Sequence, residues 1–348
     1  MNPIVISGKF LAKPINGIPR YAMEIVRHLD SIVEDMDITL CYPEDIDSSK
    51  LPDLCNIKLK ALGKSKIGWD QTILAAYCKR RRALLVNLAS CGTWYRNSIV
   101  CVHDIRPLTW DIDNNIDLKR KIINKINFAM AVSFAKQIVT VSRFSRTEIA
   151  TYYRLEERMI QVIPNGWEHL KTNRDIECPE LKRKYGSKSF FFSIGSMAPH
   201  KNFEWVVNIA KNNPDVQFLI AGKVDKSVWN YEISLEDVKN VIFLGYISDV
   251  EMQWYMQNAR ALLFPSLYEG FGIPPLEALA LGTDAIVSDI PVLRESFGDS
   301  VRYVNPKNYE IDLNEILMRP ISSSDMILKE MTWENAAIEW KKILENCV

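Results

Sequence analysis

Short apolar runs alternate with longer amphipathic stretches along this chain. A short apolar run suits a strand that is buried on both faces, and the longer stretches suit helices that cover a parallel sheet. The order strand, helix, strand, repeated many times, is typical of a doubly wound α/β fold. In the first half of the chain we expect strands at residues 4–7, 38–42, 57–61, 83–89, 99–102 and 138–141.

The alternation is interrupted once, near the middle of the chain. The segment 168–188 is rich in charge and lacks an apolar period, which predicts a connection between two domains. We expect strands again at residues 190–194, 216–221, 241–244, 261–264 and 285–287, with helices such as 202–212 between them. The sequence therefore predicts two Rossmann-like domains that face each other across a cleft, with ligands outside the carboxyl ends of the strands.

Composition excludes several classes of protein. The chain has 348 residues, 47% of them hydrophobic, and its 43 basic residues balance 43 acidic ones, so a globular protein without a nucleic-acid partner is expected. The seven cysteines are scattered and form no Cys-x-x-Cys pair, which argues against a disulfide framework and a zinc site. We see no secretory leader and no membrane-spanning run, so a cytoplasmic location is expected.

The segment 269–277, Glu-Gly-Phe-Gly-Ile-Pro-Pro-Leu-Glu, follows a predicted strand and opens a helix. Gly270 and Gly272 carry no side chain, so backbone N–H groups in this turn can approach a ligand closely. Glu269 and Glu277 are about two helical turns apart, so their carboxylates can meet different ends of one ligand. Carboxylates accept paired hydrogen bonds from sugar hydroxyls. The segment therefore predicts a site for a hydroxyl-rich, anionic ligand such as a sugar nucleotide.

Two glutamates eight positions apart also occur on many solvent-facing helices, so their surroundings decide the interpretation. Residues 261–289 resemble the signature of the retaining GT-B glycosyltransferases of family four: Glu, seven residues, Glu, with Gly-Phe-Gly directly after the first acid. The resemblance implies a GT-B fold and a nucleoside diphosphate sugar as donor. It implies that Glu269 is catalytic and holds the donor hexose, and that Glu277 holds the ribose hydroxyls. The turn residues implied in donor binding are Gly270, Phe271, Gly272 and Ile273.

Residues 193–202 resemble the opening of that family's nucleotide-binding domain, where a lysine, often assisted by an arginine, holds the diphosphate. Lys201 matches the lysine, which implies a catalytic role in neutralising the leaving group. Arginine is common in the family at the positions of Ser196 and His200, and the resemblance implies that Ser196 contacts the donor. Lys223 and helix N-termini are therefore expected to assist Lys201 in neutralising the diphosphate. The alternative for Lys201 is an exposed lysine at the start of a helix.

The resemblance also implies how the chain is divided. Residues 1–170 would form the acceptor-side domain and residues 171–330 the nucleotide-sugar domain, with a last helix at 331–348 that packs back on the first domain. The turn after the strand 241–244 resembles the loop that holds the nucleotide base through backbone groups, which implies Tyr246 and Ile247 as donor contacts. An ordinary turn with a helix cap is the alternative for this loop.

Three segments of the first domain resemble parts of the family's site. The segment Asn-Gly-Ile-Pro-Arg-Tyr places Gly17 near the donor diphosphate and Arg20 and Tyr21 near the acceptor, while an ordinary strand-to-helix turn is the alternative. His103 ends a predicted strand and matches a catalytic histidine that contacts the donor sugar near the reacting carbon. Arg143, in Ser-Arg-Phe-Ser, is expected near the acceptor or the diphosphate, beside a helix cap.

Two basic clusters, at residues 79–82 and 119–121, lie in the first domain. Many members of the resembled family act on lipid-linked acceptors, and the apolar neighbours Ile73, Leu74 and Tyr77 fit a weak peripheral contact with the inner face of a membrane. Solvated helix faces are the alternative for both clusters.

The resemblance implies a retaining hexosyltransferase that uses no metal and no cofactor and transfers a hexose to a glycan or lipid-linked acceptor in surface polysaccharide assembly. No carboxylate is evident as a covalent nucleophile, which favours front-face substitution over double displacement. Three alternatives remain open. One is a metal-dependent GT-A transferase, because Asp-x-Asp occurs at residues 45–47 and 111–113. The others are a sugar-nucleotide 2-epimerase and a catalytically silent protein that binds sugar nucleotides.

Overall fold

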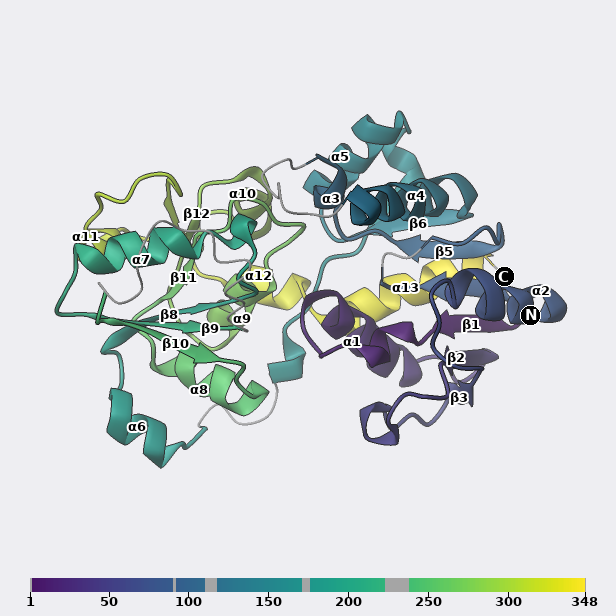
Figure 1. Ribbon diagram of the computed structural model, residues 1–348, viewed down its shortest axis with the longest axis horizontal. Coiled ribbons are helices and arrows are strands. Elements are labelled where there is room, and N and C mark those ends of the chain that lie inside the picture. The colour runs from purple at the N-terminus through teal and green to yellow at the C-terminus, as the bar shows by residue number, and fades with distance from the viewer. Residues whose placement is uncertain (1, 90–91, 110–117, 171–175, 223–237, 348) are drawn as a thin grey trace. The chain divides into compact units, whose positions relative to one another are not determined.

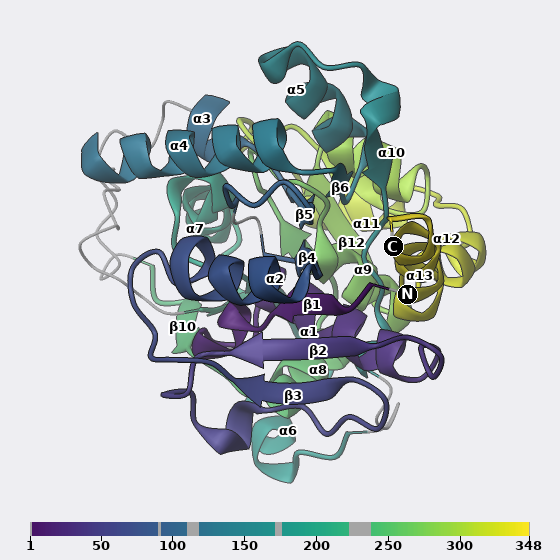
Figure 2. The ribbon, with the colours of Figure 1, turned by 90° about the vertical axis from the view of Figure 1, so that its right-hand side faces the viewer.

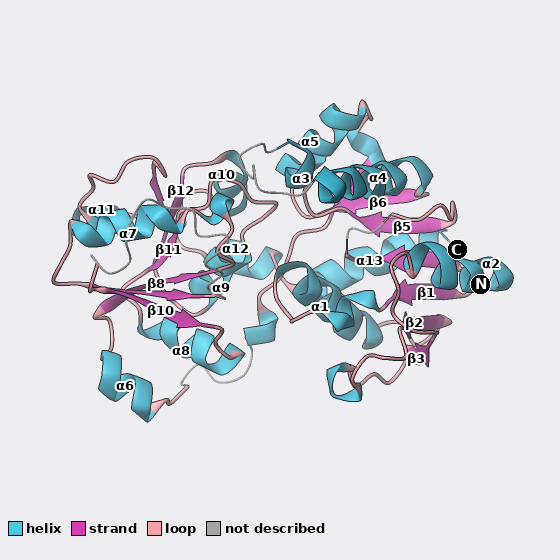
Figure 3. Cartoon of the chain, in the orientation of Figure 1, coloured by secondary structure: helices cyan, strands magenta, loops and turns pink. Residues whose placement is uncertain are grey.

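The computed structural model describes residues 2–89, 92–109, 118–170, 176–222 and 238–347 (Figure 1). Two compact units are present: residues 1–166 with 331–348 form the first, and residues 167–330 form the second. Helices and strands alternate along both units (Figure 3). The two units are therefore α/β domains, and the chain crosses between them twice.

The described part of the first unit contains a seven-stranded parallel sheet with the order β3-β2-β1-β4-β5-β6-β7. Its strands are β1 (Ile4–Ser7), β2 (Ile38–Tyr42), β3 (Lys58–Ala61), β4 (Leu84–Asn87), β5 (Ser98–Cys101), β6 (Gln137–Thr140) and β7 (Ile160–Val162). Ile4 of β1 lies opposite Ile38 on one side and Leu84 on the other. Figure 2 shows β1, β2 and β3 side by side at one end of this sheet.

Helices cover both faces of this sheet, which explains why its central strands β1, β4 and β5 are buried at every position. The helices are α1 (Gly17–Asp30), α2 (Ala75–Arg81), α3 (Arg106–Thr109), α4 (Leu118–Phe134), α5 (Arg143–Tyr153) and α13 (Trp333–Cys347), with shorter turns η1 (Lys9–Ala12), η2 (Ser48–Lys50), η3 (Asp70–Leu74) and η4 (Glu157–Met159). Successive residues of β5 point to opposite faces. Val100 packs with Phe128 of α4 and Ile149 of α5, whereas the thiol of Cys101 contacts Tyr21 of α1.

The described part of the second unit contains a six-stranded sheet with the order β10-β9-β8-β11-β12-β13, again parallel. Its strands are β8 (Phe190–Ile194), β9 (Gln217–Ala221), β10 (Val241–Gly245), β11 (Leu262–Phe264), β12 (Ala285–Ser288) and β13 (Arg302–Val304). Its helical segments are η5 (Glu168–Leu170), α6 (Pro179–Tyr185), η6 (Pro199–Lys201), α7 (Phe203–Lys211), α8 (Asp249–Asn258), α9 (Ile273–Ala280), α10 (Pro291–Phe297), α11 (Leu313–Met318) and α12 (Asp325–Glu330).

Three consecutive phenylalanines in β8 show how the second sheet is buried. Phe191 stacks on Phe218 of β9 and joins the cluster beneath α7 and α11. Its neighbours point to the opposite face, where Phe192 stacks on Tyr255 of α8 and Phe190 stacks on Trp254. The alternation of strand side chains thus supplies an apolar surface to the helices on each side.

Two details differ from the expectation. Strands β7 and β13 were not in the expected set, because each is a three-residue edge strand with one polar or charged residue, and its sequence carries little apolar signal. The segment 168–188, predicted to connect the domains, belongs to the second unit and contains η5 and α6.

The strand order reverses once in each sheet, between β1 and β4 in the first unit and between β8 and β11 in the second. At such a point the loops that follow the two adjacent strands leave in opposite directions, which opens a crevice at their carboxyl ends. The residues after β8 and β11 are therefore the place where a ligand of the second unit is expected.

Candidate functional site

The two loops at the strand reversal of the second unit are joined to each other by hydrogen bonds. The backbone N–H of Leu267 donates to the carbonyl oxygen of His200 over 2.7 Å. The side-chain amide of Asn202 donates to the carbonyl oxygen of Pro265 over 3.1 Å. These two hydrogen bonds hold the loop after β8 and the loop after β11 together.

These loops bring together Lys201 and Glu269, which the sequence nominated separately. The ammonium nitrogen of Lys201 lies 2.6 Å from Oε1 of Glu269, and both side chains remain partly accessible. The same nitrogen lies 5.4 Å from the centre of the Phe264 ring, a favourable cation–π contact. A cation and an acid therefore stand side by side at the carboxyl ends of β8 and β11, where one can attract a diphosphate and the other can accept hydrogen bonds from sugar hydroxyls.

Gly272 caps the N-terminus of α9 with a backbone that only glycine adopts readily. Its φ is +116°, and a Cβ atom there would lie 2.8 Å from Cδ2 of Leu293. Pro274 and Pro275 in the first turn of α9 have no N–H group. The N–H donors of this turn therefore come from Gly270 to Ile273, the residues implied in donor binding.

Glu277 lies on α9, one helix turn past its start, and is largely buried. Its Oε1 lies 2.7 Å from Nε2 of His169, whose side chain is only 3% exposed. His169 was not among the predicted site residues, because it lies in the charged segment that was interpreted as a connection. A lone histidine in such a segment gives no periodic or motif signal, so only the fold could reveal this pair.

The other donor-side residues follow β8 and β10. Ser196 is exposed after β8, and Tyr246 and Ile247 follow Gly245, whose φ is +70°. Tyr246 is 74% exposed. Lys223 lies outside the described residues. Nothing in the described part of the second unit brings Tyr246 or Ile247 into contact with Lys201 or Glu269, so their roles in binding the base stay predictions.

His103 lies in the first unit, just after β5, and is buried. Its Nε2 lies 2.9 Å from the carbonyl oxygen of Leu88, which only accepts, so Nε2 carries the proton and Nδ1 is an acceptor. Burial lowers the pKa of His103 to about 4, against a smaller opposing effect of this hydrogen bond. Its carbonyl oxygen accepts a hydrogen bond from Ser145 Oγ over 3.0 Å. The ring is therefore a neutral group that is fixed in place by its hydrogen bond to Leu88.

Tyr21 requires a correction. It was expected to contact the acceptor, but none of its surface is exposed. Its ring meets the ring of His103 edge-on at 4.7 Å, and its hydroxyl accepts a hydrogen bond from Nε1 of Trp340 in α13 over 2.7 Å. Burial, followed by the nearby thiol of Cys101, raises the pKa of Tyr21. Tyr21 thus packs against the ring of His103 and has no surface that a ligand could contact.

The remaining first-unit candidates lie at helix starts. Gly17 is the exposed first residue of α1 with φ of +46°, and Arg20 in the same turn is 9% exposed. Arg143 is the exposed first residue of α5. Ser142 caps that helix, its hydroxyl accepting from the N–H of Ser145 over 3.0 Å. These positions leave Gly17 and Arg143 accessible to a ligand.

The basic clusters have different neighbours from those expected. Residues 79–82 at the end of α2 are exposed, but Leu74 is fully buried, and Ile73 and Tyr77 pack against the same core. The side chains of residues 119–121 lie outside the described part of the structure. Exposed apolar side chains occur instead one turn further along α4, at Ile122, Ile123 and Ile126, which are each about half exposed.

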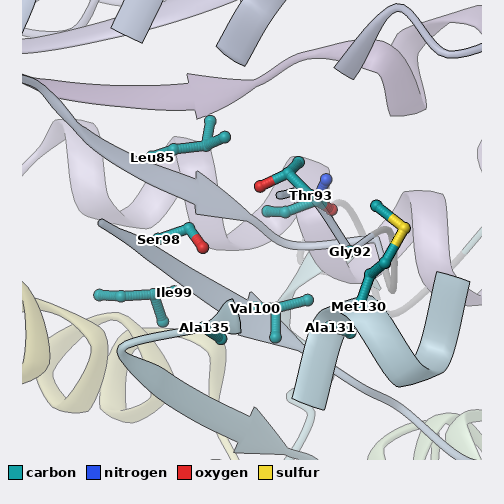
Figure 4. A pocket seen from close by; sticks show the side chains of 10 residues that line it. Leu85, Gly92, Thr93, Ser98, Ile99, Val100, Met130, Ala131 and Ala135 are labelled. Carbon is teal, nitrogen blue, oxygen red and sulfur yellow. The ribbon is translucent and has the colours of Figure 1, made fainter. Parts of the chain in front are cut away.

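A recess in the first unit lies between the sheet and α4, and none of the predicted site residues lines it (Figure 4). Its lining includes Leu85, Thr93, Ser98, Val100 and Met130. It has no space for a water-sized molecule, so it is a packing gap and not a ligand site.

The Asp-x-Asp motif at residues 45–47 has a local structural role. The carboxylate of Asp45 accepts from the N–H of Ser65 over 2.6 Å, and that of Asp47 accepts from the N–H of Ser49 over 2.9 Å. The motif at 111–113 lies outside the described residues. Among the residues that are described, no group of three His, Cys, Asp or Glu side chains could hold a metal ion, and no helix is long and apolar enough to cross a membrane.

Parts of this chain are similar to known proteins. Residues 177–339 match the family model for Glycosyl transferases group 1. The O-antigen chain mannosyltransferase RfbU of Salmonella typhimurium is 34% identical over 215 residues, which cover 61% of this chain and 57% of that protein. The O-antigen chain mannosyltransferase B of Escherichia coli is 26% identical, with 97% of each chain covered. The match to the first relative thus spans little more than half of its length.

Solved structures with low sequence identity share the fold. Sucrose-phosphate synthase from Thermosynechococcus elongatus matches with a TM-score of 0.75 at 14% identity, covering 99% of both chains. Anabaena HepE, solved in complex with UDP and glucose, matches with a TM-score of 0.69 at 13% identity, covering 99% of this chain and 100% of that one. The two Rossmann-like domains are therefore of the GT-B type, which excludes the single-sheet GT-A architecture. Residues 177–339 of this chain are therefore similar to the Glycosyl transferases group 1 family.

Proposed function

We propose that the protein is a retaining glycosyltransferase that transfers mannose from a nucleoside diphosphate donor to a growing surface polysaccharide or its lipid-linked precursor. The observation that carries this proposal is the Lys201–Glu269 pair at the carboxyl ends of β8 and β11. Such a pair can hold a diphosphate and a sugar at once. The names of the O-antigen mannosyltransferases support mannose and an O-antigen setting.

The proposed donor site divides into three parts. Lys201 neutralises the diphosphate as it leaves, which lowers the barrier because the charge grows in the transition state. Glu269 and the N–H groups of the Gly270–Gly272 turn hold the hexose, and Glu277 holds the ribose hydroxyls. The expected absence of a metal stays a prediction, and Lys201 is the group that would take its place.

The proposed reaction is a front-face substitution. The bond between the anomeric carbon and the diphosphate oxygen breaks, and the acceptor oxygen forms a new bond on the same face. The acceptor's proton passes to the departing diphosphate, so no covalent nucleophile is required. We propose, as the resemblance implies, that His103 contacts the donor sugar near the reacting carbon.

The decisive experiment combines binding with product analysis. Calorimetry with uridine, guanosine, thymidine and adenosine diphosphates identifies the base, and repeating it with a chelator tests the metal-independent proposal. Proton NMR of the product linkage then reads its anomeric configuration. An inverted product would refute the retaining assignment, and loss of binding on chelation would refute metal independence. Donor consumption without acceptor, giving a C2 epimer, would select the epimerase alternative, while binding without turnover of any donor would select the silent binding protein.

We also propose a peripheral membrane contact through α4. Ile122, Ile123 and Ile126 are exposed close together on this helix, beside the exposed Lys125. Apolar side chains with a basic neighbour suit the boundary of an anionic lipid surface. Co-sedimentation with vesicles should show binding that depends on anionic lipid and falls when all three isoleucines are changed to serine. Equal binding of the triple variant would refute the role of α4.

A further inference from the structure

His169 and Glu277 form a buried contact that links the start of the second unit to the donor site. Nε2 of His169 lies 2.7 Å from Oε1 of Glu277. The side chain of His169 is 3% exposed and that of Glu277 is 9% exposed, so both are largely closed to solvent. The imidazole is therefore the more buried of the two side chains.

The residues before and after His169 in the chain are held by contacts of their own. Nε1 of Trp167 donates to the carbonyl oxygen of Leu328 over 2.9 Å, and the carboxylate of Glu168 accepts from the N–H of Trp167 over 3.0 Å. Leu170, the next residue after the histidine, is buried. Trp167 and Leu328 both lie next to the points where the chain crosses between the units. The backbone on either side of His169 is consequently held by contacts that do not involve Glu277.

The chemistry of the contact defines what it does. An ionised carboxylate only accepts hydrogen bonds, so Nε2 of His169 donates and fixes the rotation of the Glu277 carboxylate. Oε2 and the second lone pair of Oε1 can then accept hydrogen bonds from other donors. A carboxylate that can turn freely would lose this alignment, and a buried carboxylate without its donor is also less favourable.

We infer that His169 is a positioning residue that orients Glu277 to accept hydrogen bonds from the ribose hydroxyls of the nucleoside diphosphate. The inference rests on the proposed function, because it takes the ribose as the ligand of Glu277. It adds a residue that touches no substrate and lies 108 positions away in the chain.

The test varies the protein and the ligand together. Calorimetry first shows whether uridine or guanosine diphosphate binds more tightly. For that base, we would then measure the dissociation constants of the nucleoside diphosphate and of its 2′,3′-dideoxy counterpart. His169→Ala should weaken binding of the ribose form by about tenfold, which corresponds to about 1.4 kcal/mol. Binding of the dideoxy form should not change, because that ligand lacks the hydroxyls that Glu277 holds. In a Glu277→Ala background, His169→Ala should cause no further loss.

Two conservative variants act as controls within the site. His169→Gln keeps an N–H donor near the position of Nε2 and should retain most of the affinity. His169→Asn, whose shorter amide does not reach Oε1, should behave like His169→Ala. His28→Gln is the matched control elsewhere, since His28 is a partly buried histidine on α1 whose ring contacts the backbone carbonyl of Glu24. Circular dichroism and thermal unfolding check that each variant is folded. If His169→Ala does not fold, the difference in affinity between His169→Gln and His169→Asn tests the inference instead.

The outcomes separate the inference from the proposal beneath it. Equal weakening of the ribose and dideoxy ligands by His169→Ala would show a general structural role and overturn the inference. No effect of His169→Ala, with clear weakening by Glu277→Ala, would overturn the inference and leave the proposed function standing. No effect of Glu277→Ala on the ribose ligand would overturn the proposed role of Glu277 itself.

Discussion

The ammonium nitrogen of Lys201 and the carboxylate of Glu269 lie 2.6 Å apart, although 68 positions separate them in the chain. Each comes from a loop at the strand reversal of the second sheet, so the fold alone creates the pair. The cation suits the diphosphate end of a donor and the acid suits its sugar end. The two charges also offset each other, so a change at one residue alters the field at the other.

This pairing predicts opposite effects of two substitutions on free nucleoside diphosphate. Lys201→Met removes a charge-assisted contact and should weaken binding by roughly 10- to 150-fold, from about 1.5 to 3 kcal/mol. Glu269→Gln removes a negative charge beside Lys201, so binding should stay equal or become tighter, while turnover of the donor falls strongly. Calorimetry and steady-state kinetics measure the two effects. Weaker binding of the free diphosphate by Glu269→Gln would contradict this division of roles.

Buried His103 predicts an acid-sensitive first unit. Its folded pKa of about 4 lies below the ordinary value of 6.5, so the unfolded chain binds more protons between these values. The stability that neutral His103 contributes is complete above about pH 6.5 and is lost as the pH falls toward 4. At pH 5 the loss should be about 2 kcal/mol relative to pH 7. Denaturant unfolding of His103→Gln should show a smaller decrease in the free energy of unfolding between pH 7 and pH 5. The same decrease in the variant as in the unchanged protein would contradict this prediction.

Gly272 predicts a backbone-specific effect at the donor site. An alanine there meets Leu293 and adopts a φ of +116°, so Gly272→Ala should destabilise the second unit by about 2–4 kcal/mol. It should also weaken nucleoside diphosphate binding, because the start of α9 would shift. Gly282→Ala is the matched control: its φ is +69°, but an added Cβ meets nothing within 4 Å, and the cost should be about 1 kcal/mol. Thermal unfolding and calorimetry of the two variants check this, and similar behaviour of both would refute the prediction.

The hydrogen bond from Trp340 to Tyr21 predicts a coupling between α13 and α1. Tyr21→Phe leaves the buried Nε1–H of Trp340 without this acceptor and should cost about 1–3 kcal/mol, and Trp340→Phe should cost a similar amount. The double variant should cost less than the sum, with a coupling energy of about 1 kcal/mol. Denaturant unfolding measures all three. Trp94→Phe, at a side chain that is 63% exposed, serves as the control, and strict additivity of the two core changes would argue against the bond.

Much of the fold could be predicted from local patterns. Apolar runs bounded by turns correspond to strands such as β1, β2 and β8, because a strand covered on both faces needs apolar side chains at successive positions. The glycine-rich turn predicted a ligand site, and Glu269 and Lys201 were both nominated from their segments. These features are local: a backbone angle, a missing side chain or a repeat of apolar residues is contained within a few positions.

Only the tertiary structure decided which distant residues meet. His169 reaches Glu277 across 108 positions, and Trp340 reaches Tyr21 across 319, and no short pattern carries either pairing. Burial is decided in the same way: Tyr21, placed near an acceptor by resemblance, lies beneath α13, whereas Ile122 is exposed. The sequence by itself determined most of the strands and the glycine-rich turn, since these depend on neighbours in the chain. Contacts and burial depend on how those segments pack, which is a property of the whole domain.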